Sequence, residues 1–227
     1  MKKTLGFLLL LLVTLASRAD TTNSFSNPSL NAAVPDGNPV GLSSTLNVSG
    51  ISGNTANITV NLDITGGFNG DLYSYLVSPT GTMVVLLNRV GIATGNAYGY
   101  GNTGFAITLE SASANNIHTY QTAGGYPGDL NGGGQLTGTW APDGRTIDPL
   151  SVASAFDAGP TGNTLTSLDG ANPNGVWTLF IADLSSGGQS TVVSWGLTVM
   201  TVPEPQTWTL LGGSLAAFWM INRQRRK

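Results

Sequence analysis

The chain has no cysteine and a single histidine among its 227 residues. The absence of cysteine excludes a disulfide framework, a thiolate zinc site and a cysteine nucleophile. One imidazole excludes a histidine-rich metal centre within one chain. Charge is also scarce, because only 9% of the residues are Asp, Glu, Lys or Arg, against about 25% in an average protein. The 41% of hydrophobic residues is nevertheless enough for a packed core, so the scarcity of charge does not predict disorder.

Basic residues are nearly absent from the middle of the chain. From Asp20 to Thr201 only Arg89 and Arg145 are basic, against eleven acidic residues, so this segment has a net charge of −9. Nucleic-acid binding needs clustered Lys and Arg, and no nucleic-acid partner is therefore expected. An acidic middle between basic ends predicts an exported domain with targeting segments on both sides.

The N-terminus has the composition of a secretory signal peptide. Lys2 and Lys3 give it a charged start, and residues 5–15 form an apolar run of eleven residues, too short to span a bilayer as a helix. A small-x-small site at 17–19 predicts cleavage by signal peptidase after Ala19, which makes 1–19 the signal peptide. A second candidate site ends at Ala16.

The C-terminal segment 201–227 has three parts in a fixed order. They are the motif Pro203-Glu204-Pro205, a largely apolar uncharged stretch at 207–221, and a basic tail at 223–227. Fifteen helical residues extend about 22 Å, short of the hydrocarbon core of about 30 Å, and the basic tail is expected to stay cytoplasmic. An ordinary short membrane anchor is one interpretation of this stretch.

This order resembles a PEP-CTERM sorting signal, with Pro203, Glu204 and Pro205 as its motif. The resemblance implies a Gram-negative bacterium that makes exopolysaccharide, and an exosortase that cuts near the motif. It also implies transient anchoring in the inner membrane by a short hydrophobic transmembrane helix. The final location would be the cell envelope, the outer surface or the extracellular matrix of a biofilm.

Short runs with a two-residue period predict β-strands between these ends. Residues 56–65 and 193–199 alternate between apolar and polar side chains, and residues 72–77 and 82–87 form a hairpin pattern around Ser-Pro-Thr-Gly. Trp177, Leu179 and Ile181 share one face, with Phe180 on the other. No sustained helical period occurs between residues 20 and 201. Residues 42–200 are therefore predicted to form an all-β, antiparallel β-sandwich, and 20–41 a linker or an irregular lead-in strand.

Several motifs in this region match one family in order. They are Gly70-Asp71-Leu72, then 76–82 (LVSPTGT), 136–142 (LTGTWAP), 165–170, 175–183 (GVWTLFIAD) and 194–197 (SWGL). The set resembles the P domain (P/Homo B domain) of proprotein convertases and other subtilisin-type proteases. The resemblance implies a jelly-roll-like sandwich of about eight strands, an association with serine-type endopeptidases and proteolysis, and, as in some members, a calcium site. Ala106 and Ile107 replace an acidic pair of the family pattern.

The chain lacks the parts of a serine-protease triad. His118 is the only imidazole, and no Gly-x-Ser-x-Gly motif is present. A triad needs a serine and a carboxylate on opposite sides of the imidazole. We therefore expect no catalytic residue in this chain and a loop or surface position for His118.

Calcium is the stronger chemical hypothesis, because the domain is acidic and most of its Asp residues lie in predicted turns. Calcium takes several carboxylate and carbonyl oxygens, and no contiguous Asp-x-Asp-x-Asp loop is present, so a site would have to form across loops. The candidate ligands are Asp71, Glu110, Asp169 and Asp183, with Asp129 as a further candidate. Alternatively, these residues are ordinary turn and strand-end residues.

A sugar-binding surface is another hypothesis, since sugar sites combine aromatic faces with polar side chains. The aromatic residues in loop-like sequence are Tyr98, Tyr100, Tyr120, Tyr126 and Trp140. Packing of the tyrosines against a buried Trp140 is the alternative.

Three functions follow from these expectations. The first is an exported, exosortase-sorted, non-catalytic module for surface or matrix adhesion or protein interaction. The second is a P domain that acts with a subtilisin-type protease in trans, and the third is an exopolysaccharide-binding module.

Overall fold

A computed structural model describes residues 20–202 together with Trp219, Asn222, Arg223 and Arg225. The predicted cleavage at Ala19, the sorting motif Pro203-Glu204-Pro205 and most of the predicted C-terminal helix lie outside the described residues. Within the described part of the chain, no helix has both the length and the apolar composition needed to cross a membrane.

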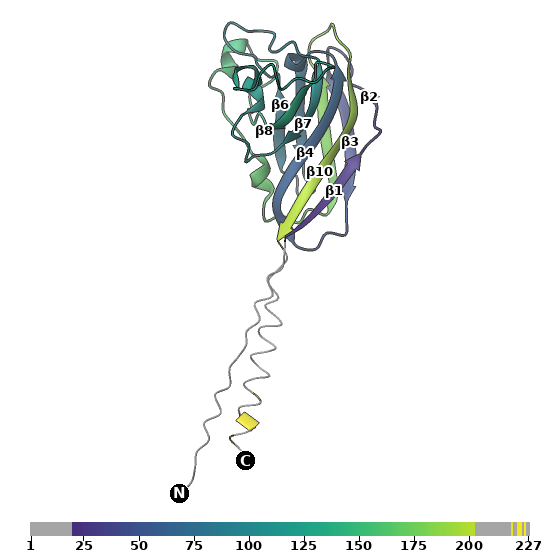
Figure 1. Ribbon diagram of the computed structural model, residues 1–227, viewed down its shortest axis with the longest axis vertical. Helices are drawn as coiled ribbons and strands as arrows, with labels where there is room; N and C mark the ends of the chain where they lie inside the picture. Colours follow the sequence, from purple (N-terminus) through teal and green to yellow (C-terminus); the bar gives the residue numbers. More distant parts are fainter. Residues whose placement is uncertain (1–19, 203–218, 220–221, 224, 226–227) are drawn as a thin grey trace.

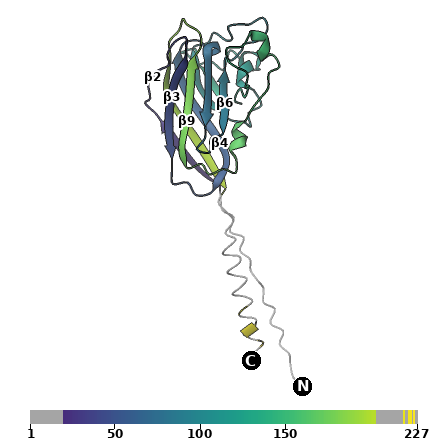
Figure 2. The same cartoon turned by 180° about the vertical axis from the view of Figure 1, so that it is seen from behind.

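Two β-sheets pack face to face (Figures 1 and 2). The six-stranded sheet has the order β1 (Thr21–Asn27), β10 (Ser190–Val202), β4 (Asn54–Gly66), β7 (Gly104–Leu109) and β8 (Leu136–Trp140), with β2 (Ala32–Ala33) also paired to β10. The four-stranded sheet has the order β3 (Asn38–Val48), β9 (Gly175–Asp183), β5 (Leu72–Val77) and β6 (Met83–Asn88). The short 3₁₀ helices are η1 (Asn69–Asp71), η2 (Ile117–Thr122), η3 (Ala153–Phe156) and η4 (Leu165–Leu168). The predicted all-β sandwich is therefore confirmed.

The sandwich differs from the prediction in strand number and in one pairing. The described residues contain ten strands rather than about eight, and β8 runs parallel to β7 whereas the other pairs are antiparallel. A parallel pair needs a crossover of a dozen residues or more, and the long connection at 110–135 supplies it. This connection contains η2 and a glycine-rich stretch at 124–134, and neither carries a strand period in the sequence.

The core forms where the inward faces of the two sheets meet. Val60, Leu62 and Ile64 of β4 alternate with exposed or half-buried polar residues, as their two-residue period predicted. Trp177 of β9 and Trp195 of β10 are each 1% exposed, and their indole nitrogens donate to Pro173 O at 2.8 Å and Ser44 Oγ at 2.9 Å. Both polar ends of these large side chains are thus satisfied inside the core.

The segment 20–41 is part of the sandwich. β1 pairs with β10 from Thr21↔Thr201 to Asn27↔Trp195, β2 pairs with the same strand, and β3 begins at Asn38. β1 is an edge strand whose residues are exposed or half-buried, so its sequence has too little apolar alternation to predict a strand with certainty. The sandwich therefore begins at Thr21, upstream of the predicted boundary at residue 42.

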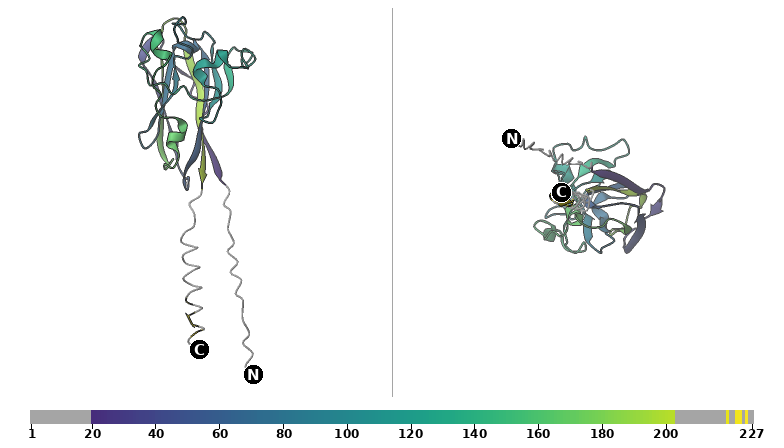
Figure 3. Two further views of the ribbon diagram at one scale, coloured as in Figure 1. Left: turned by 90° about the vertical axis from the view of Figure 1, so that its left-hand side faces the viewer. Right: turned by 90° about the horizontal axis from the view of Figure 1, so that it is seen from below.

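The start of β1 and the end of β10 lie together, because Thr21 pairs with Thr201 (Figure 3). We call the end with Thr21 and Thr201 the proximal end, and the opposite end, where Ser190 pairs with Gly66, the distal end. The thirteen residues of β10 run between them, which corresponds to about 40 Å at the usual rise per residue of a strand.

Candidate functional sites

His118 lies in the long connection between β7 and β8, one of the two expected positions (loop or surface), and it is buried there. It lies in η2 with 3% of its surface exposed. Its Nδ1 is 2.7 Å from Asp143 Oδ2 and its Nε2 is 3.0 Å from the carbonyl oxygen of Ile92. Asp143 also accepts hydrogen bonds from Asn88 N at 3.1 Å and from Arg145 Nη1 at 3.0 Å. In the sequence, Asp143 stands directly before Gly144, a pair typical of turns.

This His–Asp pair has the arrangement of two members of a catalytic triad but not of the third. A triad histidine uses Nε2 to take a proton from a serine, whereas Nε2 of His118 faces a backbone carbonyl, which can only accept. Nε2 must therefore carry the proton in this hydrogen bond. The geometry makes His118 a buried connection between the loops that carry Ile92 and Asp143.

The four calcium candidates lie at two ends of the sandwich. Asp71 and Asp183 are distal neighbours, because Asp183 pairs with Leu72 and Leu184 N donates to Asp71 O at 2.9 Å. Asp183 also accepts from Ser190 Oγ at 3.4 Å, next to the distal end of β4.

Glu110 and Asp169 lie toward the proximal end. Glu110 Oε1 accepts from Asn57 Nδ2 at 3.4 Å, and Gly170 N donates to Thr55 O at 2.7 Å. Asn57 and Gly66 stand nine positions apart on β4, a separation of about 30 Å. The four candidates therefore cannot share one ion. Asp129 folds over Gly125 in the loop before β8, and no group of three or more His, Cys, Asp or Glu side chains with metal-binding geometry occurs among the described residues.

Asp71 and Asp183 form a buried charge cluster with Arg89. Asp183 is fully buried and Asp71 is 6% exposed. Arg89 Nη2 is 3.9 Å from Asp71 Oδ1, and the guanidinium donates to Gly70 O, Pro149 O and Ser185 Oγ at 3.2–3.4 Å. Arg89 thus holds three distal loops together.

Burial governs the protonation of this cluster. The pKa of Asp183 is raised to about 6, chiefly by desolvation and also by the neighbouring carboxylates of Asp71 and Asp36, against hydrogen bonds from Ser185 and Ser190 that lower it. Desolvation also raises the pKa of Asp71, opposed by Ser185 and Arg89. The same loss of solvent lowers the pKa of Arg89.

Most of the aromatic residues suggested for sugar binding pack against one another. Tyr120 is fully buried and Trp140 is 4% exposed. The ring of Tyr120 lies 4.6 Å from that of Tyr100, 6.1 Å from that of Tyr126 and 6.2 Å from that of Trp140. Tyr98 alone of the five is largely exposed, at 83%. Four of the five therefore form a packing cluster, and Tyr98 is a single exposed ring outside it.

A different aromatic group lies on the outer face of the four-stranded sheet. The rings of Tyr75 and Phe180 are stacked at 4.7 Å, and Tyr73 lies 5.8 Å from Tyr75. All three side chains are half-buried. Phe180 also covers Gly41 of β3, where a Cβ would lie 2.9 Å from the ring. The alternation in 72–77 places Tyr73 and Tyr75 on one face of β5, and the alternation in 176–182 places Phe180 on the outer face of β9. These two patterns were the sequence signal for the aromatic group.

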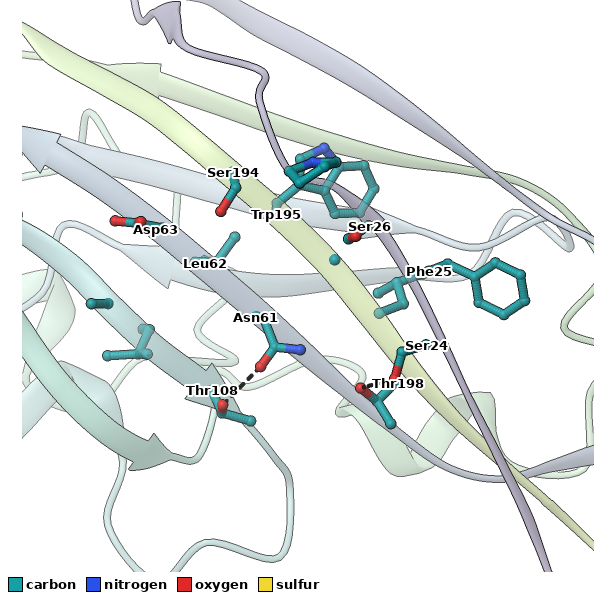
Figure 4. Close-up of a pocket in the computed structure, with 15 residues that line it drawn as sticks. Ser24, Phe25, Ser26, Asn61, Leu62, Asp63, Thr108, Ser194, Trp195 and Thr198 are labelled. Carbon is teal, nitrogen blue, oxygen red and sulfur yellow. Dashed lines mark hydrogen bonds between the residues drawn. The ribbon is translucent and has the colours of Figure 1, made fainter.

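The outer face of the six-stranded sheet carries a shallow hollow of about 490 Å³ (Figure 4). It crosses β1, β10, β4 and β7, midway along the sheet. Its polar lining consists of Ser24, Ser26, Asn61, Asp63, Thr108, Ser194 and Thr198. Gly196 and Ala106, which have minimal side chains, leave the space open. The alternation at 56–65 and 193–199 predicted two of these strands, but it did not indicate that their polar faces form a candidate site.

Among known proteins, solved structures are similar to this chain at low identity and low TM-score. No protein-family model and no curated protein matches the chain. The crystal structure of the serine protease of Aeromonas sobria is similar, with 14% identity, a TM-score of 0.42, and coverage of 81% of this chain and 27% of that chain. The complex of that protease with the chaperone ORF2 gives 14% identity, a TM-score of 0.38 and the same coverage. This chain thus spans about a quarter of the length of those chains.

Proposed function

We propose that this chain is an exported, non-catalytic β-sandwich module that holds a partner outside the cell, in surface or matrix adhesion or protein interaction. The observation that carries this proposal is the broad outer face of the six-stranded sheet, with its polar hollow. The only imidazole of the chain supports it, because both of its ring nitrogens are engaged inside the fold. Binding on a rigid sheet needs no movement of the core.

The exported location is part of this proposal. The signal peptide at 1–19 and the motif at 203–205 support it, with signal peptidase and exosortase as the processing partners. β1 begins at the proximal end and β10 ends there. A module held at its C-terminus would therefore leave the sheet faces and the distal loops accessible.

Fractionation of cells tests this location. The tagged full chain is expressed in a Gram-negative host with an exosortase, next to a variant in which Pro203, Glu204 and Pro205 are alanine. We expect the wild type in the outer-surface or matrix fraction and the variant in the inner-membrane fraction. Cytoplasmic wild-type chain that retains residues 1–19 would contradict the proposal.

A protease-linked role in trans is the second candidate, favoured by the ordered motifs that resemble a P domain. The motifs at 70–72 and 175–183 lie side by side in the structure as the start of β5 and as β9. Affinity purification of the full chain from its host tests this role. A subtilisin-type protease should co-purify at a fixed ratio, and its absence would remove the candidate.

Of the calcium hypothesis, we retain as a proposal an ion at Asp71 and Asp183, since Glu110 and Asp169 lie too far away. A bound ion would raise the melting temperature by mass action. The melting temperature of the full chain is compared in calcium and in EDTA at matched ionic strength, with Asp183→Asn as the control. Equal melting temperatures for the wild type would exclude the ion, as would a rise that persists in the variant.

A further inference from the structure

We propose that the hollow on the six-stranded sheet binds a neutral glycan chain lying across the strands. This inference rests on the proposed function, because it names the matrix ligand that such a module would hold. It concerns a different surface from the loop tyrosines, which are packed together.

The hollow exists because small residues meet on neighbouring strands. Gly196 of β10 pairs with Ser26 of β1 and with Asn61 of β4, and Ala106 of β7 pairs with Asp63. A Cβ at Gly196 would lie 2.7 Å from Phe25 O, so this position has no room for a side chain and the adjoining strand stays close. An irregularity in the pairing between Val192 and Ser194 brings Ser194 opposite Asp63. The register of the four strands thus places Gly196 and Ala106 in the middle of the hollow and polar side chains around them.

Polar side chains form a row perpendicular to the strands. The row follows the strand pairings from Ser26 past Gly196 to Asn61, Thr108 and Thr139. Neighbouring strands are about 4.8 Å apart, so Asn61, Thr108 and Thr139 recur at about that interval, close to the length of one sugar ring, and Gly196 leaves one gap between Ser26 and Asn61. A linear glycan across the strands would meet a polar group at every ring except the one over Gly196. A peptide would instead need the exposed backbone of a sheet edge.

The hydrogen bonds within the lining orient its polar groups. Thr108 Oγ1 donates to Asn61 Oδ1 at 2.8 Å, which leaves the Asn61 amide nitrogen as a donor toward solvent. Ser24 Oγ and Thr198 Oγ1 are 3.2 Å apart. Hydroxyl groups both donate and accept, as sugar hydroxyls do. The lining is therefore complementary to a polyhydroxyl ligand without further rearrangement.

Charge selects a neutral glycan over an acidic one. Asp63 is the one charged residue of the lining, and its Oδ1 already accepts from Gln135 Nε2 at 2.9 Å. The segment from Asp20 to Thr201 has a net charge of −9. A polyuronate or a nucleic acid would be repelled by this field and would find no basic group in the hollow.

Affinity electrophoresis of the full chain in mild detergent tests the inference. Native gels contain dextran, mixed-linkage β-glucan, galactomannan, alginate or no polymer. We expect slower migration in at least one neutral polymer and none in alginate. Ala106→Trp, which fills the hollow, and Asn61→Ala should each weaken binding by about tenfold, the equivalent of one or two lost hydrogen bonds. Ser43→Ala, on the exposed outer face of β3, should bind as the wild type does.

Three outcomes would overturn the inference: no retardation by any neutral polymer, retardation by alginate, or retardation that Ala106→Trp leaves unchanged. Thermal melts of each variant establish that a loss of binding is not a loss of folding. If Ala106→Trp fractionates with the matrix as the wild type does, the hollow is not the matrix contact, whereas the proposed exported module stands. If the wild type itself stays in the cytoplasm, the proposed function fails independently of the gels.

Discussion

Buried polar residues connect loops in this protein, and His118 is the clearest example. Its hydrogen bonds reach Ile92 and Asp143, and Asp143 in turn binds Asn88 and Arg145. Asp143 has a completely buried side chain, so its charge depends on these donors. Nothing around His118 in the sequence indicates its burial, because its partners lie more than twenty residues away. Residue type alone could exclude a triad but could not locate the histidine.

Replacing His118 with alanine should destabilise the fold. The variant leaves a buried carboxylate without one of its donors, and we expect a loss of roughly 3 kcal/mol in the free energy of unfolding, as for other broken buried pairs. Urea unfolding measures the loss. Thr119→Ala, at an exposed neighbouring position, should differ little from the wild type. A His118→Ala protein as stable as the wild type would show that Asp143 does not need the imidazole.

Asp183 should make the protein less stable as pH rises from about 4 to about 6. Its folded pKa is about 6, above its ordinary value of 3.8, so the folded state binds the proton more tightly than the unfolded chain does. The favourable contribution is complete below pH 4 and lost as pH rises through 6. The carboxylates of Asp71 and Asp36 raise the pKa of Asp183 in the same direction as burial, and the hydrogen bonds from Ser185 and Ser190 oppose them.

Melting temperatures at pH 4 and pH 7 test this dependence by comparing the wild type with Asp183→Asn. The wild type should lose several degrees more between the two values than the variant does, because the asparagine cannot ionise. Asp157→Asn is a suitable control, since Asp157 is exposed and hydrogen-bonded to Thr94 outside the cluster. Parallel pH profiles for the wild type and Asp183→Asn would contradict the assignment.

Among the elements, strands with a clear apolar run or alternation were predictable, the edge strand β6 included, whereas the edge strands β1 and β8 were not. β4, β9 and β10 have a buried face and a polar face, so their two-residue period appears in the sequence. β1 has little buried surface, and β8 joins β7 only through a parallel crossover, so neither has a strong local signal. The four calcium candidates lie at two ends of the sandwich for a related reason. Which turns meet depends on strand direction and register, and these place Asp71 with Asp183 but Glu110 with Asn57.

Removal of β1 should therefore expose β10. A chain that begins at Pro28 loses the pairings from Thr21 to Asn27 and presents an unpaired strand edge, which favours pairing with another chain. We expect a lower melting temperature and dimers or larger species in size-exclusion chromatography. A chain that begins at Thr21 is the matched control. A monomeric variant with the wild-type melting temperature would show that 20–27 is a dispensable lead-in.

At the scale of the whole molecule, we expect no peptide hydrolysis by the purified full chain. Nε2 of His118 is bound to a carbonyl, which leaves the chain's one imidazole unable to act as a general base. A broad peptide-substrate assay, with His118→Ala in parallel, checks this expectation. Cleavage by both proteins would indicate an accompanying protease. Cleavage by the wild type that is absent in a folded His118→Ala variant would contradict the non-catalytic function.

The central position of β10 has a mechanical consequence. β10 ends at Val202 and is paired with β1 on one side and with β4 on the other along most of its length. A pulling force that enters at Val202 while a ligand holds the sheet face would act parallel to these strands. Both ladders would then be loaded in shear, so many hydrogen bonds must break together and not one after another. The module would yield at a higher force in this direction than if its sheets were peeled apart.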